Sequence, residues 1–342
     1  MRSWIQPHWQ RFTAVSALLA PLSLLFGVVA AARRAGYRVG LASRVRLPVP
    51  VVVVGNITAG GTGKTPLTVW LAQTLRAQGR SPGIVCRGYG GSKSAPQPVL
   101  PDSDPYACGD EAVLLAQRSG CPVWTAADRP VAARALLAAV PGCDVVVSDD
   151  GLQHYALQRD FEICVVDGDR GFGNGWLLPA GPLREPRSRL AAVDAIVVNG
   201  RGNQSLLPAI RQFNPQCIGM QLEARGFWNL RDRSRRVGAE HFRGKRIHAV
   251  AGIGNPERYF QQLSDMGLDT TAHAFPDHHA YAEGELDFPG ADAVVMTEKD
   301  AVKCQSFAAA TWWAMAVDAV PDAGLAELVL RRLEVAVSRQ QP

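Results

Sequence analysis

Residues 51–65 read VVVVGNITAGGTGKT, and this stretch decides the fold. Four consecutive valines are typical of a buried strand in a parallel sheet, because helices cover both faces of such a strand. The glycine-rich segment that follows leads into PLTVWLAQTLRAQG, which has the apolar spacing of a helix. A strand, a glycine loop and a helix in this order form a P-loop, whose backbone N–H groups and helix N-terminus attract phosphate.

The loop residues have separate expected roles. Lys64 would contact the β- and γ-phosphates during catalysis, and the Thr65 hydroxyl would bind Mg²⁺. The usual pattern has glycine where this chain has Thr58, so the match is to the G-G-T-G-K-T loop of ParA-like and metallochaperone-like ATPases. Those proteins carry a lysine where this chain has Ala59, which argues against a ParA-type switch. The expected nucleotide contacts are Thr58, Gly60, Gly61, Thr62, Gly63, Lys64 and Thr65.

Residues 144–150, DVVVSDD, predict a second buried strand that ends in two carboxylates. In P-loop enzymes an acidic strand end holds Mg²⁺ or its water ligands. We therefore expect Asp149 and Asp150 to be metal ligands, with Glu111 as a third carboxylate. The alternative is that the two adjacent acids cap the next turn.

An uncharged segment of twenty residues, TAVSALLAPLSLLFGVVAAA, runs from Thr13 to Ala32. As a helix it would be roughly 30 Å long, which is the thickness of a bilayer core. Arginines are more frequent after the segment than before it, so the rest of the chain should face the cytoplasm. A signal peptide, a buried core helix and a helix lying in one leaflet are the alternatives. Pro21 favours a kink, and spanning and interfacial placement both stay open.

The composition limits the class of protein. The chain has 342 residues, 47% of them hydrophobic and 20% charged, so we expect a packed core rather than disorder. The net charge of +5 is spread along the chain, which suits an anionic lipid surface better than a nucleic acid. The seven cysteines form no C-x-x-C pair, so neither a disulfide framework nor a zinc site is indicated.

Taken in order, the motifs of this chain resemble the tetraacyldisaccharide 4′-kinase family. The resemblance covers most of the chain and rests on the combination rather than on any single motif. The motifs are GNITAGGTGKTP (55–66), RGYGG (87–91), GDE (109–111), DDGLQH (149–154), RDF (159–161), LPAGPLREP (178–186), AGIGNP (251–256), FPDHH (275–279) and TEKD (297–300).

The resemblance implies an ATP- and Mg²⁺-dependent lipid kinase. It would transfer the γ-phosphate of ATP to the 4′-hydroxyl of a tetraacyldisaccharide 1-phosphate in lipid A biosynthesis, at the inner membrane and facing the cytoplasm. The implied partners are this lipid and the membrane surface, with no nucleic acid and no obligate protein partner. A membrane-associated ATPase switch and a soluble kinase with a core N-terminal helix are the competing functions.

The resemblance also implies a catalytic base. In the family the aspartate of the GDE motif acts as the base and a histidine supports it, which assigns these roles to Asp110 and to His278 or His279. Spacing does not decide between the histidines, and we favour His278. On residue type alone Asp110 could equally be a helix N-cap.

Further residues are expected around the nucleotide and the substrate. Arg87 and Arg129 could clamp substrate or ATP phosphates, or they could form salt bridges. The TEKD motif resembles N-K-x-D, in which an acid reads a purine edge, so Glu298, Lys299 and Asp300 are expected near the nucleotide. A polar turn between strand and helix is the alternative.

The predicted architecture is a P-loop NTPase-like α/β fold, a parallel sheet with helices on both faces. The predicted regions are an N-terminal membrane-anchor helix (1–35), a P-loop kinase core (36–225), a charged linker (226–244) and a smaller α/β lobe (245–342). We expect ATP between the lobes, and their closure to bring His278 toward Asp110. The predicted core strands lie near Val51, Ile84, Val145, Ile163 and Ile196.

Overall fold

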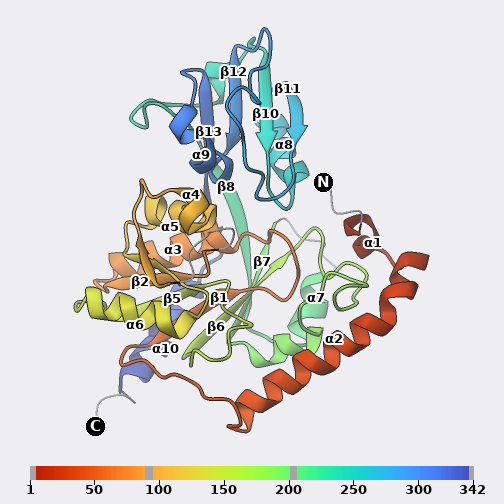
Figure 1. Cartoon of the computed structure of the whole chain (residues 1–342), viewed down its shortest axis with the longest axis vertical. Helices are drawn as coiled ribbons and strands as arrows, with labels where there is room; N and C mark the ends of the chain where they lie inside the picture. Colours follow the sequence, from red (N-terminus) through yellow and green to blue (C-terminus); the bar gives the residue numbers. More distant parts are fainter. Residues whose placement is uncertain (1–4, 89–94, 201–205, 339–342) are drawn as a thin grey trace.

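The computed structural model describes residues 5–88, 95–200 and 206–338, and it has two lobes and an N-terminal helix beside them (Figure 1). The large lobe has seven strands, all five predicted ones among them. These are β1 (Val51–Gly55), β2 (Pro82–Cys86), β3 (Gln97–Val99), β4 (Val123–Thr125), β5 (Val145–Asp149), β6 (Phe161–Asp167) and β7 (Ala195–Asn199). Its helices are α3 (Lys64–Ala77), α4 (Pro105–Cys108), α5 (Asp110–Ser119), α6 (Arg129–Ala139), η1 (Arg187–Ala192), α7 (Leu206–Arg211) and α10 (Leu325–Ser338).

Two long antiparallel strands, β8 (Cys217–Asn229) and β13 (Trp312–Pro321), run from the large lobe into the small lobe. The small lobe otherwise contains β9 (Arg236–Val237), η2 (Ala239–Phe242), β10 (Ile247–Ala251), α8 (Pro256–Asp265), β11 (Thr270–Ala274), β12 (Ala293–Thr297), α9 (Glu298–Cys304) and η3 (Gln305–Phe307). Through these two strands the described residues form one 13-stranded sheet, in the order β11-β10-β12-β13-β8-β7-β6-β1-β5-β2-β4-β3, with β9 beside β8.

Helices cover both faces of the large-lobe sheet, as the sequence predicts. Successive residues of a strand point to opposite faces, so Val52 and Val54 of β1 pack with α3, α5 and α10. Val51 and Val53 pack with α6 and α7 on the other face. All four valines are completely or almost completely buried, which is the reason for the unbroken valine run. The carboxyl ends of β1 and β5 consequently meet at one edge of the sheet.

The segment expected as a linker, residues 226–244, is more ordered than its charge suggests. Phe227 and Trp228 belong to β8, and Phe242 packs against Phe227 with ring centroids 4.8 Å apart. These aromatic side chains are buried in the small-lobe core, and Arg233 and Arg235 pack over the rings of Trp228 and Trp313. The lobes are therefore joined by paired strands. The C-terminal helix α10 also departs from the predicted division, because Leu325, Val329 and Leu333 pack in the large lobe.

The N-terminal region forms a short helix α1 (Gln6–Gln10) and a long helix α2 (Ala14–Arg38), which begins one residue after its N-cap Thr13. In the part of the chain that the structure describes, α2 is the helix long and apolar enough to cross a membrane. It contains Pro21 and runs along the side of the large lobe (Figure 1). Helix α2 thus extends a few residues beyond residue 35, the predicted limit of the N-terminal region.

Helix α2 is the reverse of an ordinary surface helix. Its buried side chains are Ser16 and Ser23, whereas Leu18 and Leu25 are 79% and 61% exposed. The Ser23 hydroxyl donates to the Leu177 carbonyl at 2.9 Å and accepts from the Ala180 N–H at 2.9 Å. An outward apolar face this large excludes the core-helix alternative. The polar contacts fasten α2 to the loop that carries the LPAGPLREP motif.

Candidate functional site

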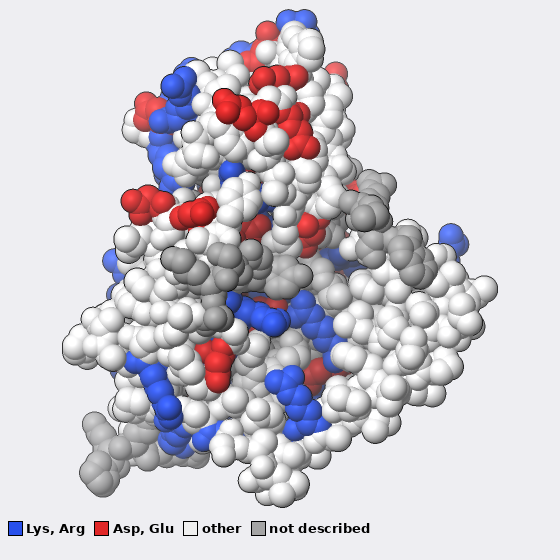
Figure 2. Space-filling view, viewed as in Figure 1, with Lys and Arg blue, Asp and Glu red and all other residues white. Residues whose placement is uncertain are grey.

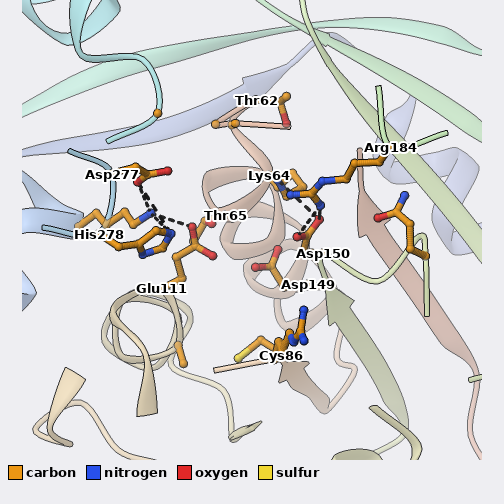
Figure 3. A pocket seen from close by; sticks show the side chains of 18 of the residues that line it. Thr62, Lys64, Thr65, Cys86, Glu111, Asp149, Asp150, Arg184, Asp277 and His278 are labelled. Carbon is orange, nitrogen blue, oxygen red and sulfur yellow. Dashed lines mark hydrogen bonds and ion pairs between the residues drawn. The ribbon is translucent and has the colours of Figure 1, made fainter. Parts of the chain in front are cut away.

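A cleft of about 1270 Å³ lies between the two lobes and is also bordered by α2. Figure 2 shows Lys and Arg side chains gathered in this hollowed face of the molecule. In Figure 3 the labelled side chains fall into two groups, one around Lys64, Asp150 and Arg184 and the other around Glu111, Asp277 and His278. The P-loop lies between the groups, so both face the place where a bound phosphate chain would lie.

The P-loop is held in shape by asparagines behind it. Asn56 donates to the Thr62 hydroxyl at 3.3 Å, and Asn199, at the end of β7, donates to the Thr62 carbonyl at 2.9 Å. Gly63 has a φ of +90°, and a Cβ there would collide with Asn199, so glycine is required. The predicted residues that line the cleft are Gly60, Gly61, Thr62, Gly63, Lys64 and Thr65.

Thr58 is the exception among the predicted nucleotide contacts. It is 7% exposed and forms a β-bridge with Leu183. The backbone on either side of it is also tied to the motif loop, because Arg184 N donates to Ile57 O and Ala59 N donates to Pro182 O, both at 2.7 Å. The structure therefore places Thr58 where the P-loop meets the loop that fastens α2, outside the lining of the cleft.

Asp150 lies just beyond the end of β5 and is held by two cations. Arg184 Nη1 donates to both carboxylate oxygens of Asp150, at 3.2 Å to Oδ1 and 3.0 Å to Oδ2. Lys64 Nζ lies 3.7 Å from Asp150 Oδ1. Burial alone would raise the pKa of Asp150, but the charges of Lys64 and Arg184 hold it well below its ordinary value. We name Lys64, Asp150 and Arg184 the phosphate wall.

The neighbouring Asp149 has the opposite electrostatics. It is 2% exposed and accepts a hydrogen bond from the Thr68 hydroxyl at 2.6 Å. Burial, with the negative charge of Glu111, raises the pKa of Asp149 to about 6. The two adjacent acids thus have pKa values pushed apart by their surroundings, a pattern that is common at functional sites.

The donor set around Asp149 suits Mg²⁺. The described residues contain no group of three or more His, Cys, Asp or Glu side chains arranged as a complete metal site. Mg²⁺ in kinases is usually held by one or two carboxylates, waters and substrate phosphates, so a protein cage is not needed. The four predicted ligands Thr65, Glu111, Asp149 and Asp150 all line the cleft, and a divalent cation there would offset the burial and the carboxylate repulsion that together raise the Asp149 pKa.

The structure brings Asp110 and His278 together across the two lobes. Asp110 begins α5 and is 5% exposed, and both of its carboxylate oxygens lie 3.1 Å from His278 Nδ1. The predicted approach of His278 is therefore already complete here. His279 lies apart, with its ring 2.9 Å from Glu285. Gly109 occupies the N-cap position of α5, so the capping alternative for Asp110 does not apply.

The environment keeps the Asp110 carboxylate ionised. Burial alone would raise its pKa, but the hydrogen bond with His278 and the charge of Lys299 lower it. Burial likewise opposes charge on His278, yet the contact with Asp110 raises the pKa of that histidine. Elsewhere among the described residues positive φ is confined to glycines and Asp150, whereas His278 has a φ of +60°. Such strained backbone is found where a side chain must be aimed at a partner.

The three candidates of the TEKD motif separate in the structure. Asp300 is fully buried and accepts from Gly252 N at 3.0 Å and from the Thr297 hydroxyl at 2.6 Å. It does not line the cleft, and these contacts are those of the polar-turn alternative; a place for Asp300 beside the nucleotide stays a prediction. Glu298 lines the cleft, but its carboxylate is paired with Arg118 and accepts from Trp228 Nε1 at 3.2 Å. Lys299 instead reaches Glu111 and Asp277.

The two predicted substrate arginines also differ. Arg129 is 1% exposed and donates to the backbone carbonyl of Asp149 at 2.9 Å, so it stabilises the carboxyl end of β5. Arg87 is exposed at the rim of the cleft and remains a candidate for a phosphate contact. Residues 89–91 of the RGYGG motif lie outside the described residues.

Four residues of the site had no predicted role in nucleotide binding or catalysis. Arg184 and Asp277 belong to recognised motifs, which was the signal that could have found them. Arg170 and Arg258 had no such signal. Arg170 donates to the carbonyls of Gly61 in the P-loop and Gly254 in the small lobe, and Arg258 pairs with Asp167 at 3.1 Å and with Asp169. These arginines fasten the small lobe against the P-loop.

Known proteins resemble this chain along almost its whole length. The family model described as tetraacyldisaccharide-1-P 4′-kinase matches residues 15–334. Tetraacyldisaccharide 4′-kinases of Azoarcus sp. and Aromatoleum aromaticum are 51% and 53% identical, over 96% and 95% of this chain and 94% and 96% of theirs. A solved structure described as the apo form of LpxK from Aquifex aeolicus in complex with ATP is 25% identical, with a TM-score of 0.77 over 93% of this chain and 99% of that one.

Proposed function

This chain belongs to the tetraacyldisaccharide 4′-kinase family, and we propose that its cleft transfers the γ-phosphate of ATP to the 4′-hydroxyl of a tetraacyldisaccharide 1-phosphate. The supporting observation is that one cleft is bordered by a P-loop, by His278, which is paired with the buried Asp110, and by an outward-facing apolar helix. A membrane-associated ATPase switch has no need of the Asp–His pair. A kinase for a lipid needs all three.

The P-loop and the phosphate wall would bind the nucleotide. The backbone of residues 60–63 and the Lys64 ammonium neutralise the phosphates, and Arg184 keeps Asp150 and Lys64 in position. Bound Mg²⁺ would supply further charge neutralisation, with Thr65, Asp149, Asp150 and Glu111 as the residues available to hold it. Asp150 is ionised, and Asp149, whose pKa is raised to about 6, loses its remaining proton when a cation arrives.

Asp110 would act on the acceptor sugar. Its ionised carboxylate takes the proton of the 4′-hydroxyl as the oxygen attacks the γ-phosphorus, and ADP leaves with the electrons of the broken P–O bond. His278 donates to the carboxylate and orients it. Because Asp110 is on the large lobe and His278 on the small lobe, this pair exists only while the lobes are together.

The lipid would approach along α2. Phe26, Val29 and Ala30 of this helix line the cleft, while Leu18, Leu22 and Leu25 face outward. The acyl chains of a substrate can therefore remain in the hydrocarbon region while its sugar enters the cleft. Arg33 and Arg34 directly follow the apolar segment. This positively charged flank supports placement at the cytoplasmic face of the inner membrane.

Transfer can be measured directly. The purified chain is incubated with Mg²⁺·ATP and the disaccharide 1-phosphate in detergent micelles, and mass spectrometry follows the lipid. We expect a gain of one phosphate, none with Lys64→Ala and none on a disaccharide whose 4′-position is already phosphorylated. Hydrolysis of ATP without a phosphorylated lipid would support the ATPase switch and refute the kinase.

The membrane role of α2 has a separate test. Leu22→Glu with Leu25→Glu places charge on the outward apolar face, so we expect the full chain to stop floating with anionic phospholipid vesicles. Leu100→Glu changes a leucine of similar exposure on the large lobe and is the matched control. Equal flotation of the wild-type protein and both variants would contradict membrane binding through α2.

A further inference from the structure

Lys299, at the start of α9, lies among the acidic residues beside His278. Its Nζ is 3.0 Å from Glu111 Oε1, 3.1 Å from Asp277 Oδ1 and 3.4 Å from Nε2 of His278. The side chain is 14% exposed, so protein groups rather than bulk water surround the ammonium. Figure 3 shows Asp277, His278 and Glu111 on the same side of the cleft. Lys299 contacts all three of them.

The Lys299 side chain is protonated in this position. The carboxylates of Glu111 and Asp277 lie at hydrogen-bond distance from its Nζ and favour the ammonium form. A protonated lysine has three N–H donors and no acceptor. The ring nitrogen that faces it, Nε2 of His278, is therefore placed to accept a hydrogen bond.

The other ring nitrogen, Nδ1, faces a hydrogen-bond acceptor rather than a donor. Nδ1 of His278 is 3.1 Å from each oxygen of the Asp110 carboxylate. An ionised carboxylate only accepts hydrogen bonds, so Nδ1 must carry the proton. Asp110 favours a proton on Nδ1, whereas the positive charge of Lys299 opposes a second proton on Nε2, so together they favour the tautomer with the proton on Nδ1 and a lone pair on Nε2.

We propose that Lys299 is a positioning residue for phosphate transfer, because its contact with Nε2 keeps the Nδ1–H of His278 directed at Asp110. This role rests on the proposed function. With Nε2 occupied by Lys299, the imidazole is not the group that takes the substrate proton. The O–H bond of the sugar breaks toward a carboxylate oxygen of Asp110, the hydroxyl oxygen forms its bond to the γ-phosphorus, and ADP is the leaving group.

The same position allows a different role, which the experiment must separate. Lys299 lines the cleft, so it could contact an ATP phosphate directly. A phosphate ligand that acts on binding affects KM for ATP. A residue that sets the tautomer of His278 affects kcat and changes the ring signals of a protein without any nucleotide.

The test combines kinetics with ¹⁵N NMR of histidine-labelled full-length protein in micelles. His278→Gln identifies the His278 signals among the seven histidines. In the wild-type protein we expect a protonated Nδ1 and an acceptor Nε2, and in Lys299→Met a loss of this single tautomer. We expect kcat to fall about 10- to 100-fold in Lys299→Met, with KM for ATP changed less than about twofold. Lys299→Arg should recover most of the loss, because a guanidinium also only donates.

Lys245 provides the matched control. Its Nζ is 2.9 Å from Nε2 of His241, elsewhere in the small lobe and outside the cleft lining. Lys245→Met removes the same kind of lysine–histidine contact and should leave kcat and the His278 signals unchanged.

Three results would overturn the role of Lys299. They are a wild-type His278 protonated on Nε2, a Lys299→Met protein with unchanged tautomer, and a Lys299→Met protein with raised KM but wild-type kcat. The first of these results needs no variant, so the proposal can still be refuted if the Lys299→Met protein fails to fold. If the wild-type protein transfers no phosphate, the proposed function fails and the positioning role fails with it; if wild type and Lys299→Met transfer equally, only the positioning role fails.

Discussion

The two sides of the cleft pair their charges differently. In the phosphate wall, Asp150 is paired with Lys64 and Arg184, and all three come from the large lobe. On the facing side, Asp110 belongs to the large lobe whereas His278 and Lys299 belong to the small lobe; we name these three the proton wall. The phosphate wall is complete within one lobe, while the proton wall requires two. The phosphate wall can therefore form within the large lobe alone, whereas the proton wall depends on the small lobe being in place.

The largest effect is expected from the phosphate wall. Lys64→Ala removes the cation that faces the transferred phosphate and leaves Asp150 with one partner. We expect kcat/KM to fall about 10³-fold or more, because charge stabilisation is the main contribution of a P-loop enzyme. Phosphate transfer to the lipid measures the loss, and circular dichroism checks that the fold is retained. A loss of less than tenfold would contradict the assignment of Lys64.

Asp110→Asn addresses the proton wall with almost no change of shape. We expect kcat to fall about 10²- to 10³-fold while ATP still binds, because only the proton acceptor is lost. Titration of ATP separates binding from transfer. Asp104→Asn changes an aspartate that caps α4 outside the cleft and should retain full activity. Equal kcat values for wild type and Asp110→Asn would end the assignment of the base.

The two histidines of the DHH segment give a smaller and more selective effect. His278→Gln should lower kcat about 10- to 100-fold, since the Asp110 carboxylate loses its orienting donor. His279→Gln should change kcat less than about twofold, because that ring contacts Glu285 instead. Steady-state kinetics of both variants decides between them. The reverse order would mean that the working enzyme uses the other histidine.

The smallest expected effect concerns stability rather than chemistry. Arg118 of the large lobe pairs with Glu298 of the small lobe and with Asp318 of β13. Arg118→Ala leaves the enclosed Glu298 carboxylate without its cation, so we expect the free energy of unfolding to fall by about 2 kcal/mol. Chemical denaturation measures it.

Arg331→Ala is the control for Arg118→Ala. It breaks an ion pair with Glu327 on the exposed surface of α10, where solvent already screens both charges. We expect no measurable change in unfolding. A similar loss in both variants would show that the Arg118 contact adds nothing to the joining of the lobes.

The sequence predicted the core of the large lobe well, because its signals are local. The valine run of β1, the glycines of the P-loop and the acidic end of β5 each lie within a few residues of one another, and one strand–loop–helix unit positions them. Phe227 and Phe242 were harder to interpret. They lie in a charged segment whose apolar residues show no helical or strand spacing. Their burial depends on packing against side chains from other elements of the small-lobe core.

By itself, the sequence determined the P-loop, the apolar N-terminal helix and the acids available for catalysis, since strand burial, glycine turns and hydrophobic length are written in neighbouring residues. The tertiary structure decided which of these groups meet. Asp110 and His278 are 168 residues apart, and Lys299 lies further along the chain, so no spacing rule connects them. Their contact depends on how β8 and β13 set the small lobe against the P-loop. That arrangement arises from the packing of the whole sheet, which no single segment encodes.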